Sequence, residues 1–454
     1  MELLTTILSF LLVIGVLVFV HELGHFLTAI WTGMRADVFA LGMGPRMMGW
    51  NRRTGFTFGK LPDNLELGDD TDYRICWFPI GGYVKIVGMV DESFDTDFKD
   101  RAPEHYEFRS KKNWQKALVL VAGVAMNILF AIGVFTMMSY VYGEDRLATT
   151  SVSHVEKSSP FQRAGLEAGD KIVAIDGQGV TTWNEITERL ADAAQDVVTI
   201  SVVGSKGARN ITVNSADLHS HLSTGMGLGI IPSGMKTVVA GVISGRPAEK
   251  AGLEPGDVIL AVDSVSINAT RQLTQYVNAH PGKQVTLHIE RKDSVRPIVV
   301  TVGNDGLIGI ETGAKYDGPM HHTTFGLAQS FSRSFSDVGS TVVMIGRSVA
   351  MVFQGTVSVK QSFGGPLQIA KMAERSRELG MEPFLRFMGL ISISLAVMNL
   401  LPLPGLDGGH LVFVGIESII RREIPTMVKI RFQQVGMALL LALMAFVLYL
   451  DITR

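Results

Sequence analysis

Residues 3–25 read LLTTILSFLLVIGVLVFVHELGH, an apolar run that leads directly into a cluster of polar residues. The part before His21 contains no Asp, Glu, Lys or Arg, and it approaches the roughly 20 residues that a helix needs to cross a bilayer. The run is not typical of a signal peptide, because Glu2 replaces a basic flank and no small-residue cleavage site precedes the polar cluster. We therefore predict a retained membrane segment over residues 1–30.

The polar cluster His21-Glu22-Leu23-Gly24-His25 has the pattern H-E-x-x-H. Residues four apart share one face of a helix, so both imidazoles can bind a single metal ion. The glutamate is not a ligand in this pattern, and it can act as a general base toward a metal-activated water. Two histidines and a glutamate are costly at the end of an apolar helix unless they have such a role. The pattern therefore indicates a catalytic metal site.

A third ligand is needed, because catalytic zinc sites usually have three protein ligands and one open position. No suitable side chain follows closely after His25, but residues 399–410, NLLPLPGLDGGH, place Asp407 at the end of another apolar run. Pro402 begins a helix-breaking stretch, and irregular backbone at membrane depth is tolerated where it lines a cavity. We therefore predict that Asp407 binds the same ion as the two histidines. A divalent ion with this ligand set is best explained as one Zn²⁺.

Three further stretches without charged residues cover positions 117–143, 387–406 and 432–450, so four membrane spans are expected. Lys and Arg gather in the first-to-second connection and in the last loop, whereas the N-terminal flank has none. The positive-inside rule then places both connections in the cytoplasm, and both termini and the long middle region outside. The expected segments are 1–30, 31–115, 116–143, 144–225, 226–315, 316–385, 386–412, 413–431 and 432–454.

Composition narrows the class of protein further. The chain has 454 residues, 47% hydrophobic and 19% charged, with a formal net charge of −2. It has no general positive charge, so nucleic acid is not expected as a partner. Cys76 is the only cysteine, so no intrachain disulfide can form.

The middle region contains an internal repeat. Residues 160–176 read PFQRAGLEAGDKIVAID and residues 247–263 read PAEKAGLEPGDVILAVD, with ten of 17 positions identical at an offset of 87. An offset this long, with strand-like alternation after each Gly-Asp, predicts two tandem β-rich domains, 144–225 and 226–315. Each segment resembles the signature of a circularly permuted bacterial PDZ domain. Such domains bind peptide ends by adding a strand to a sheet, although two folded spacers would explain the repeat equally well.

Two other segments have alternative interpretations. Residues 73–87, YRICWFPIGGYVKIV, predict a β-hairpin that enters or lies on the membrane, although an ordinary cytoplasmic hairpin is also consistent with the pattern. Residues 325–355 place Phe331 and Phe335 on one helical face with charged residues nearby. We expect an interfacial amphipathic helix within 316–385, because a fifth span would reverse the orientation of the termini.

Taken together, H-E-x-x-H in a first span and N-x-x-P-x-x-x-x-D-G in a later one resemble the site-2 protease family of intramembrane zinc metalloproteases. The resemblance covers almost the whole chain. It implies a polytopic α-helical membrane protein with four transmembrane helices, a membrane-associated β-hairpin, and two PDZ domains inserted between the second and third spans. Residues 123–127, GVAMN, are similar to a G-x-x-x-N element of the family, although Gly123 could equally be a packing position.

The resemblance also implies roles for individual residues. The zinc ligands would be His21, His25 and Asp407, with Glu22 as the catalytic base. Substrate-binding residues would lie in the later span and in the hairpin, where a strand pairs with the extended substrate: Asn399, Pro402, Ile80, Gly81, Gly82, Tyr83 and Val84. The expected substrates are single-span membrane proteins such as a trimmed anti-sigma factor, and remnant signal peptides. The expected location is the bacterial inner membrane, with the PDZ domains periplasmic and the active site toward the cytoplasm.

Two other classes remain open from the residues alone. A non-enzymatic adaptor could use its PDZ pair to bind peptide ends, and a transporter could pass a metal ion through histidine and aspartate ligands. The complete set of three ligands and a glutamate argues against the adaptor, and the scarcity of other polar residues in the spans argues against the transporter. His410 is not expected to be a fourth ligand, because it would close the open position.

Overall fold

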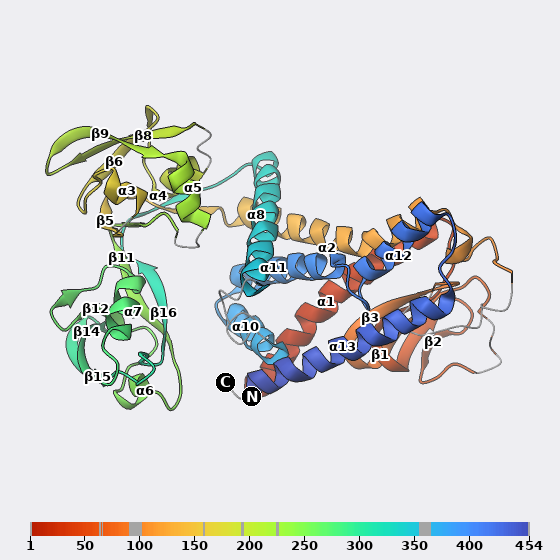
Figure 1. Cartoon of the computed structure of the whole chain (residues 1–454). Coiled ribbons are helices and arrows are strands. Elements are labelled where there is room, and N and C mark those ends of the chain that lie inside the picture. Colours follow the sequence, from red (N-terminus) through yellow and green to blue (C-terminus); the bar gives the residue numbers. More distant parts are fainter. Residues whose placement is uncertain are drawn as a thin grey trace. The chain divides into compact units, whose positions relative to one another are not determined.

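The computed structural model describes residues 2–452 except 63, 64, 66, 90–101, 158, 192–194, 224–226 and 354–364. The chain forms two compact units (Figure 1). The membrane unit comprises Met1–Gly143 and Thr324–Arg454, and the second unit comprises Glu144–Thr323. Each unit has its own core, so each is described separately.

Four helices of the described chain are long and apolar enough to cross a membrane, which confirms the four predicted spans. They are α1 (Glu2–Trp31), α2 (Asn113–Val141), α11 (Met381–Leu400) and α13 (Thr426–Ile452). The second of these is central, because α2 packs against α1 and α11 as well as two helices that are not among the four spans. The first helix continues through the H-E-x-x-H pattern to Trp31, so both histidines lie well inside a regular helix.

The third span ends where the sequence predicted a break. Helix α11 ends at Leu400, residues 401–406 form an irregular loop, and α12 (Asp407–Ile420) begins at the predicted zinc ligand. The start of α12 lies very close to the end of α11. A Cβ atom on Gly408 would collide with the Leu401 carbonyl oxygen, so only glycine fits at this crossing.

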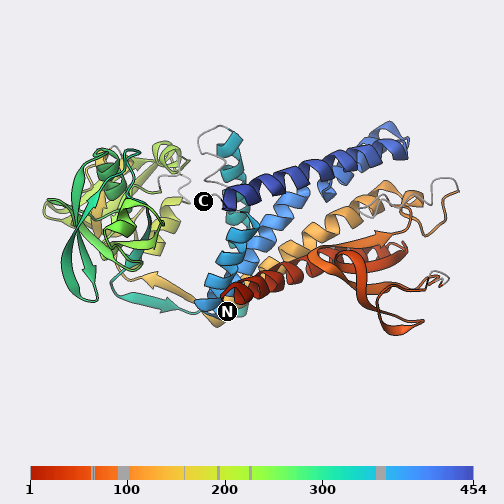
Figure 2. The ribbon, with the colours of Figure 1, turned by 90° about the horizontal axis from the view of Figure 1, so that it is seen from below.

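The region between the second unit and the third span contains α8 (Leu327–Phe353) and α10 (Pro366–Glu378). Residues 354–364 of the predicted interfacial region lie outside the described part of the chain. Helix α8 crosses α2 and α11 instead of running alongside them (Figures 1 and 2). Its buried side, including Val338, packs with Ile132 and Ile393 of those helices, while Phe331 and Phe335 are half exposed. The predicted helix is therefore amphipathic and joins the bundle along one face.

The connection between the first two spans forms a sheet of β1 (Ala36–Asn51), β2 (Gly55–Phe58) and β3 (Asp72–Ile86), followed by a short 3₁₀ turn, η1 (Phe108–Ser110). The segment predicted as a hairpin is β3, but its two arms do not pair with each other. Both pair with β1, so that Ala40 lies opposite Tyr83 on one side and Arg74 on the other. The two bent strands therefore interlock, and the arm at 82–86 forms the edge of the sheet.

Left-handed glycines and a buried ion pair explain the interlocking. Gly42 and Gly81 have φ values of 82° and 76°, which allow β1 and β3 to bend. Arg46 donates from Nε to Asp72 Oδ2 over 3.1 Å, and this carboxylate is fully buried. Because an unpaired carboxylate would be costly there, the ion pair fixes the two strands against each other.

The second unit contains the two predicted β-rich domains. The first has strands β5 (Val152–Val155), β6 (Lys171–Ile175), β7 (Gln178–Gly179), β8 (Val197–Gly204), β9 (Gly207–Asn214) and β10 (Ile230–Pro232). Its helices are α3 (Pro160–Arg163), α4 (Trp183–Ala191) and α5 (Ser215–Ser223). Four strands form a sheet in the order β7-β6-β8-β9, and β5 pairs with β10. Apolar side chains between the sheet and the helices form one core.

The second domain has strands β11 (Met235–Val242), β12 (Val258–Val262), β13 (Val265–Ser266), β14 (Gln284–Arg291), β15 (Ser294–Thr301) and β16 (Ile310–Tyr316). Its helices are α6 (Pro247–Lys250) and α7 (Thr270–Asn278). The main sheet has the order β15-β14-β12-β11-β16, over a separate core. Outside both domains, β4 (Glu144–Leu147) pairs with β17 (Met320–Thr323), so the two connecting strands form a ribbon.

The sequence repeat corresponds to a structural repeat. Asp176 and Asp263, which are 87 positions apart, both have φ of 49°, and each Oδ1 accepts a hydrogen bond over 2.8 Å from a backbone N–H. The donors, Thr199 and Thr286, are also 87 positions apart. This matched geometry, together with two separate sheets, confirms two tandem domains between the second and third spans, as expected of a PDZ pair.

Candidate metal centre

Helix α1 places the two histidines of H-E-x-x-H on one face, toward α2. Their Nε2 atoms are 3.2 Å apart, and both side chains are almost completely buried. His25 donates from Nδ1 to the Val119 carbonyl of α2 over 2.8 Å. Because one ring nitrogen carries the proton in a neutral imidazole, this bond leaves the lone pair on Nε2.

Asp407 comes from the first turn of α12 and meets the two histidines. Its Oδ2 atom lies 3.1 Å from His21 Nε2 and 3.3 Å from His25 Nε2. The three atoms thus form a nearly equilateral triangle. Ligands of a tetrahedral zinc with bonds of about 2.0–2.1 Å are about 3.3 Å apart, so this donor set fits the ion. The same oxygen is buried and has no hydrogen-bond partner among the described residues, as expected of a carboxylate oxygen that binds a cation.

Two asparagines contact His21. Asn127 of α2 places its amide nitrogen 3.3 Å from Nδ1, and its Oδ1 atom is buried without a partner in the described chain. Exchanging the amide oxygen and nitrogen lets Oδ1 accept the Nδ1 proton, which satisfies both groups and leaves Nε2 free to bind metal. Asn399 of α11 places its Nδ2 atom 3.2 Å from Nε2. From the sequence, Asn127 was placed only in an element that is similar to the G-x-x-x-N element of the family.

Glycines on both helices make the close approach of α1 and α2 possible. A Cβ atom on Gly123 would collide with His25 Nε2 and would lie 2.7 Å from His21 Cε1. A Cβ atom on Gly24 would overlap the Ala122 carbonyl oxygen. Gly123 is therefore a packing glycine, and its neighbours are the two imidazoles of the candidate metal site.

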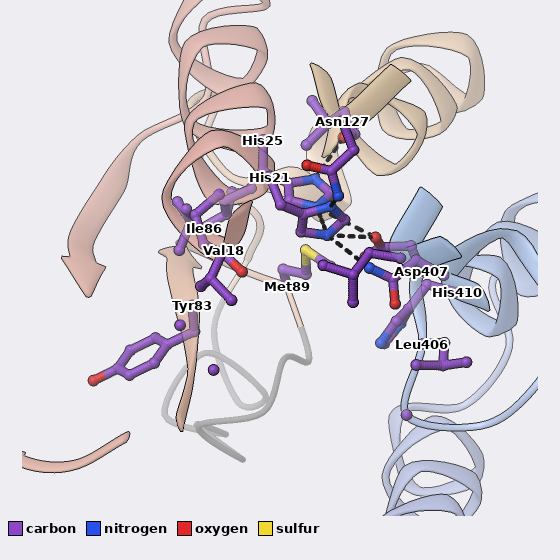
Figure 3. A pocket seen from close by; sticks show the side chains of 18 of the residues that line it. Val18, His21, His25, Tyr83, Ile86, Met89, Asn127, Leu406, Asp407 and His410 are labelled. Carbon is purple, nitrogen blue, oxygen red and sulfur yellow. Dashed lines mark hydrogen bonds and ion pairs between the residues drawn. The ribbon is translucent and has the colours of Figure 1, made fainter. Parts of the chain in front are cut away.

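The metal centre opens into a cavity of about 210 Å³ (Figure 3). In Figure 3, Val18, Tyr83 and Ile86 lie on one side of the histidines, and Leu406 and His410 lie on the other. One wall is therefore built by α1 and the edge strand of β3, and the other by the chain around Asp407. Gly82 brings the strand close to α1, because a Cβ atom there would lie 2.7 Å from Val18 and 3.1 Å from Glu22 Cγ.

The cavity collects most of the residues singled out in the sequence. Its lining includes Glu22, Gly81, Gly82, Tyr83, Val84 and Asn399 together with the three metal-binding side chains. Pro402 is exposed on the loop and is not among the lining residues described, and the side chain of Ile80 lies outside the described part. His410 also lines the cavity but is not part of the three-residue ligand cluster.

Several lining residues were not predicted from the sequence, among them Met89 and Gln433. Met89 follows β3, and nothing in its surroundings in the sequence distinguishes it from other apolar residues. Gln433 belongs to the last span, where a polar residue in an apolar helix is a recognisable signal. The prediction treated position 433 only as part of a membrane-spanning stretch.

Comparisons with known proteins agree with this centre. Residues 9–443 match peptidase family M50. The chain is 31% identical over 472 residues to regulator of sigma-E protease RseP of Escherichia coli, covering 98% of both chains. It is 29% identical over 460 residues to regulator of sigma E protease of Haemophilus influenzae, again covering 98% of both. RseP of Salmonella typhimurium is 28% identical over 480 residues, with full coverage of both chains.

An H-E-x-x-H helix within a bundle of membrane spans, joined by a distant aspartate, defines a membrane-embedded zinc metalloprotease. The chain belongs to peptidase family M50, the site-2 protease family. It is thus a multi-pass membrane enzyme whose cofactor is zinc, with His21, His25 and Asp407 as the candidate metal site. The predictions of family, enzyme class and cofactor are confirmed.

Proposed function

We propose that this enzyme cleaves single-span membrane proteins within the bilayer, as a step in regulated intramembrane proteolysis. The observation that carries the proposal is the position of the metal centre. His21, His25 and Asp407 meet inside the helix bundle, at a cavity that is bordered by the edge strand of β3. A peptide bond that reaches this cavity must come from a segment that has entered the membrane unit.

Residue roles follow from the chemistry of amide hydrolysis. When bound by the three side chains, zinc polarises the scissile carbonyl and lowers the pKa of water. Glu22 lines the same cavity, so its carboxylate is placed to accept a proton from the attacking water and to return it to the leaving nitrogen. His25 is kept in the required tautomer by its bond to Val119, and His21 by Asn127.

The substrate would bind as an extended strand. A helical peptide bond has its carbonyl in an intrahelical hydrogen bond, so a membrane helix must unwind before hydrolysis. The edge arm of β3, including Gly82, Tyr83 and Val84, offers backbone groups for pairing on the cavity side. Gly81 and Ile80 would shape the turn that precedes this arm, and Asn399 would contact the substrate backbone. Pro402 would act indirectly by fixing the loop before Asp407.

The proposed substrates are an anti-sigma factor that has already been trimmed outside the membrane, and remnant signal peptides. The name of the relative in Escherichia coli, regulator of sigma-E protease, supports this class. The two PDZ domains would exclude substrates with bulky outer domains, or bind newly made peptide ends. Their position in the chain, between the second and third spans, supports a role on the face that substrates approach.

We further propose that the enzyme lies in the bacterial inner membrane with both termini and the PDZ pair in the periplasm. The two termini lie at the same end of the helix bundle (Figure 1). Arg421 and Arg422 lie in the loop that precedes α13, at the opposite end of that helix from the C-terminus. Because basic residues favour the cytoplasmic side, this arrangement supports an active site closer to the cytoplasm.

Two matched substrates test this function. Both carry the same single span, one with a short outer tail and one with a folded outer domain, and each is added to the purified chain in nanodiscs. We expect cleavage of the short-tailed protein, with mass spectrometry placing the cut within the span. A zinc chelator should abolish this cleavage, and added zinc should restore it. Cuts found only in the soluble tails would contradict intramembrane proteolysis.

A deletion tests the proposed role of the PDZ pair. Removing residues 150–312 should permit cleavage of the substrate with the folded outer domain, because the size restriction is then absent. The rate for the short-tailed substrate serves as the control and should change little. If the deletion leaves the preference between the two substrates unchanged, the PDZ pair does not select by size.

A further inference from the structure

Gln433 is a buried polar residue that the zinc chemistry does not use. It lies in α13, a membrane-spanning helix, and only 2% of its surface is exposed. Its side chain lines the cavity of the metal centre, and its Oε1 atom has no hydrogen-bond partner among the described residues. A buried amide oxygen without a hydrogen-bond donor costs free energy in an apolar interior. A bound molecule in the cavity could supply that donor.

The neighbouring contacts hold α13 in one place relative to Asp407. The ring of Phe432 packs against Phe413 of α12 with centroids 4.8 Å apart. Lys429 pairs with Glu417 of the same helix over 2.6 Å. Gly436 lies against Pro404, where a Cβ atom would collide with the proline. Residues on both sides of Gln433 are thus packed against α12 or against the loop that precedes Asp407, and these contacts hold the Gln433 side chain at the cavity wall.

An extended substrate needs partners on both of its edges. If β3 pairs with one edge, the backbone N–H and C=O groups on the other edge would face the wall formed by the chain around Asp407 and by Gln433 of α13. Inside a membrane these groups cannot remain without hydrogen bonds at low cost. The amide of Gln433 is one of the few polar side chains on this wall, beside Asn399 and His410.

We propose that Gln433 binds substrate, with its Oε1 accepting a hydrogen bond from a backbone N–H on the edge that faces away from β3. This inference rests on the proposed function and extends it. Because the bond is made to the backbone, it does not depend on the side chains of the substrate. It selects for unwound segments, since a helical N–H is already bonded to its own chain.

The test combines a change in the enzyme with a change in the substrate. Gln433→Met keeps the length of the side chain but removes the amide acceptor. Gln434→Met is the matched control, because Gln434 is the next residue on the helix and is exposed. In a model single-span peptide, an ester replaces one amide at a time, which removes one N–H; the scissile bond itself stays an amide. Values of kcat and KM are measured for each pair, together with the zinc content.

With the all-amide peptide, we expect Gln433→Met to raise KM about tenfold and to keep the zinc content of the wild type. The KM of Gln434→Met should equal that of the wild type. At one peptide position, the ester should raise KM by a similar factor in the wild-type enzyme and should have no further effect in Gln433→Met. Independent, multiplicative effects at every position, or an unchanged KM in Gln433→Met, would overturn the proposal. Failure of the wild-type enzyme to cleave any peptide would instead contradict the proposed function.

Discussion

Gly123 lies against the imidazoles of both His21 and His25, and this contact leaves no room for a side chain at position 123. An added Cβ atom would collide with His25 Nε2 and would lie 2.9 Å from His21 Nδ1. The histidines would have to rotate away from Asp407, or α1 and α2 would have to separate. Since zinc ligands tolerate little displacement, the site depends on the absence of a side chain at this position.

We predict that Gly123→Ala lowers zinc affinity about tenfold or more and reduces cleavage in proportion, with the helical content retained. Gly133→Ala is the control on the same helix, because no atom lies within 4 Å of its added Cβ. That variant should keep its zinc and gain slightly in helix stability, by up to about 1 kcal/mol. Zinc is measured by mass spectrometry of the metal and helicity by circular dichroism. Normal zinc content in Gly123→Ala would contradict the contact described above.

At this scale the sequence predicted the three residues of the candidate metal site but not their surroundings. His21, His25 and Asp407 were found because charged or polar residues are costly in apolar segments, and because the H-E-x-x-H spacing has a geometric meaning. The partner of His21, Asn127, could not be assigned, since it depends on how α1 and α2 are rotated against each other. Met89 lines the cavity because of the path that the chain takes after β3, and no local sequence pattern predicts that path.

On the scale of elements, the turn at Asp263, between strands β12 and β13 of the second PDZ domain, provides a pH-dependent interaction. The Thr286 backbone N–H and the Tyr276 hydroxyl both donate to the Asp263 carboxylate. These two hydrogen bonds, the one from Thr286 more strongly, lower the pKa of the carboxyl group below its usual value of 3.8. A carboxyl group with a lowered pKa in the folded state stabilises the fold when ionised. Its contribution is fully present above about pH 4 and is lost as the pH falls through the lowered pKa.

We predict that acid loosens strands β12 and β14 less in Asp263→Asn than in the wild type. Asparagine keeps the Oδ1 acceptor and tolerates the φ of 49°, but it does not titrate. Hydrogen exchange of the two strands, corrected for intrinsic rates, is compared between about pH 5 and pH 2.5. The wild type should lose protection over this range, and the variant should show a flatter profile. Equal profiles would show that Asp263 does not contribute.

The bounds of the helices were easier to predict than the arrangement of the strands. Four apolar stretches defined four spans, because length and the absence of charge are local properties. The break after Leu400 followed from prolines and glycine in the loop. The hairpin at 73–87 was only partly predictable, because the pairing of β3 with β1 on both sides is set by contacts far apart in the sequence. Alternation within one strand does not specify its partner.

On the scale of the whole molecule, the proposed orientation in the membrane rests on the distribution of Lys and Arg and can be tested with single cysteines. In a Cys76→Ser background, Lys206→Cys and Arg422→Cys are prepared separately. Lys206 lies in the β8–β9 turn with 63% of its side chain exposed, and Arg422 lies in the exposed loop before α13. A maleimide that cannot cross membranes should label the first variant in intact spheroplasts and the second only after permeabilisation. The reverse pattern would contradict a periplasmic PDZ pair.

The central claim is that zinc held by His21, His25 and Asp407 acts together with Glu22 to hydrolyse a peptide bond inside the membrane unit. The most direct measurement compares cleavage of a single-span peptide by the wild type and by Glu22→Gln, with zinc determined in both. We predict one zinc per chain in both proteins and a loss of cleavage of about 10²-fold or more in the variant, because a general base typically contributes that much. Cleavage by Glu22→Gln at the wild-type rate, with equal zinc, would contradict the role of Glu22 and the account of the site built on it.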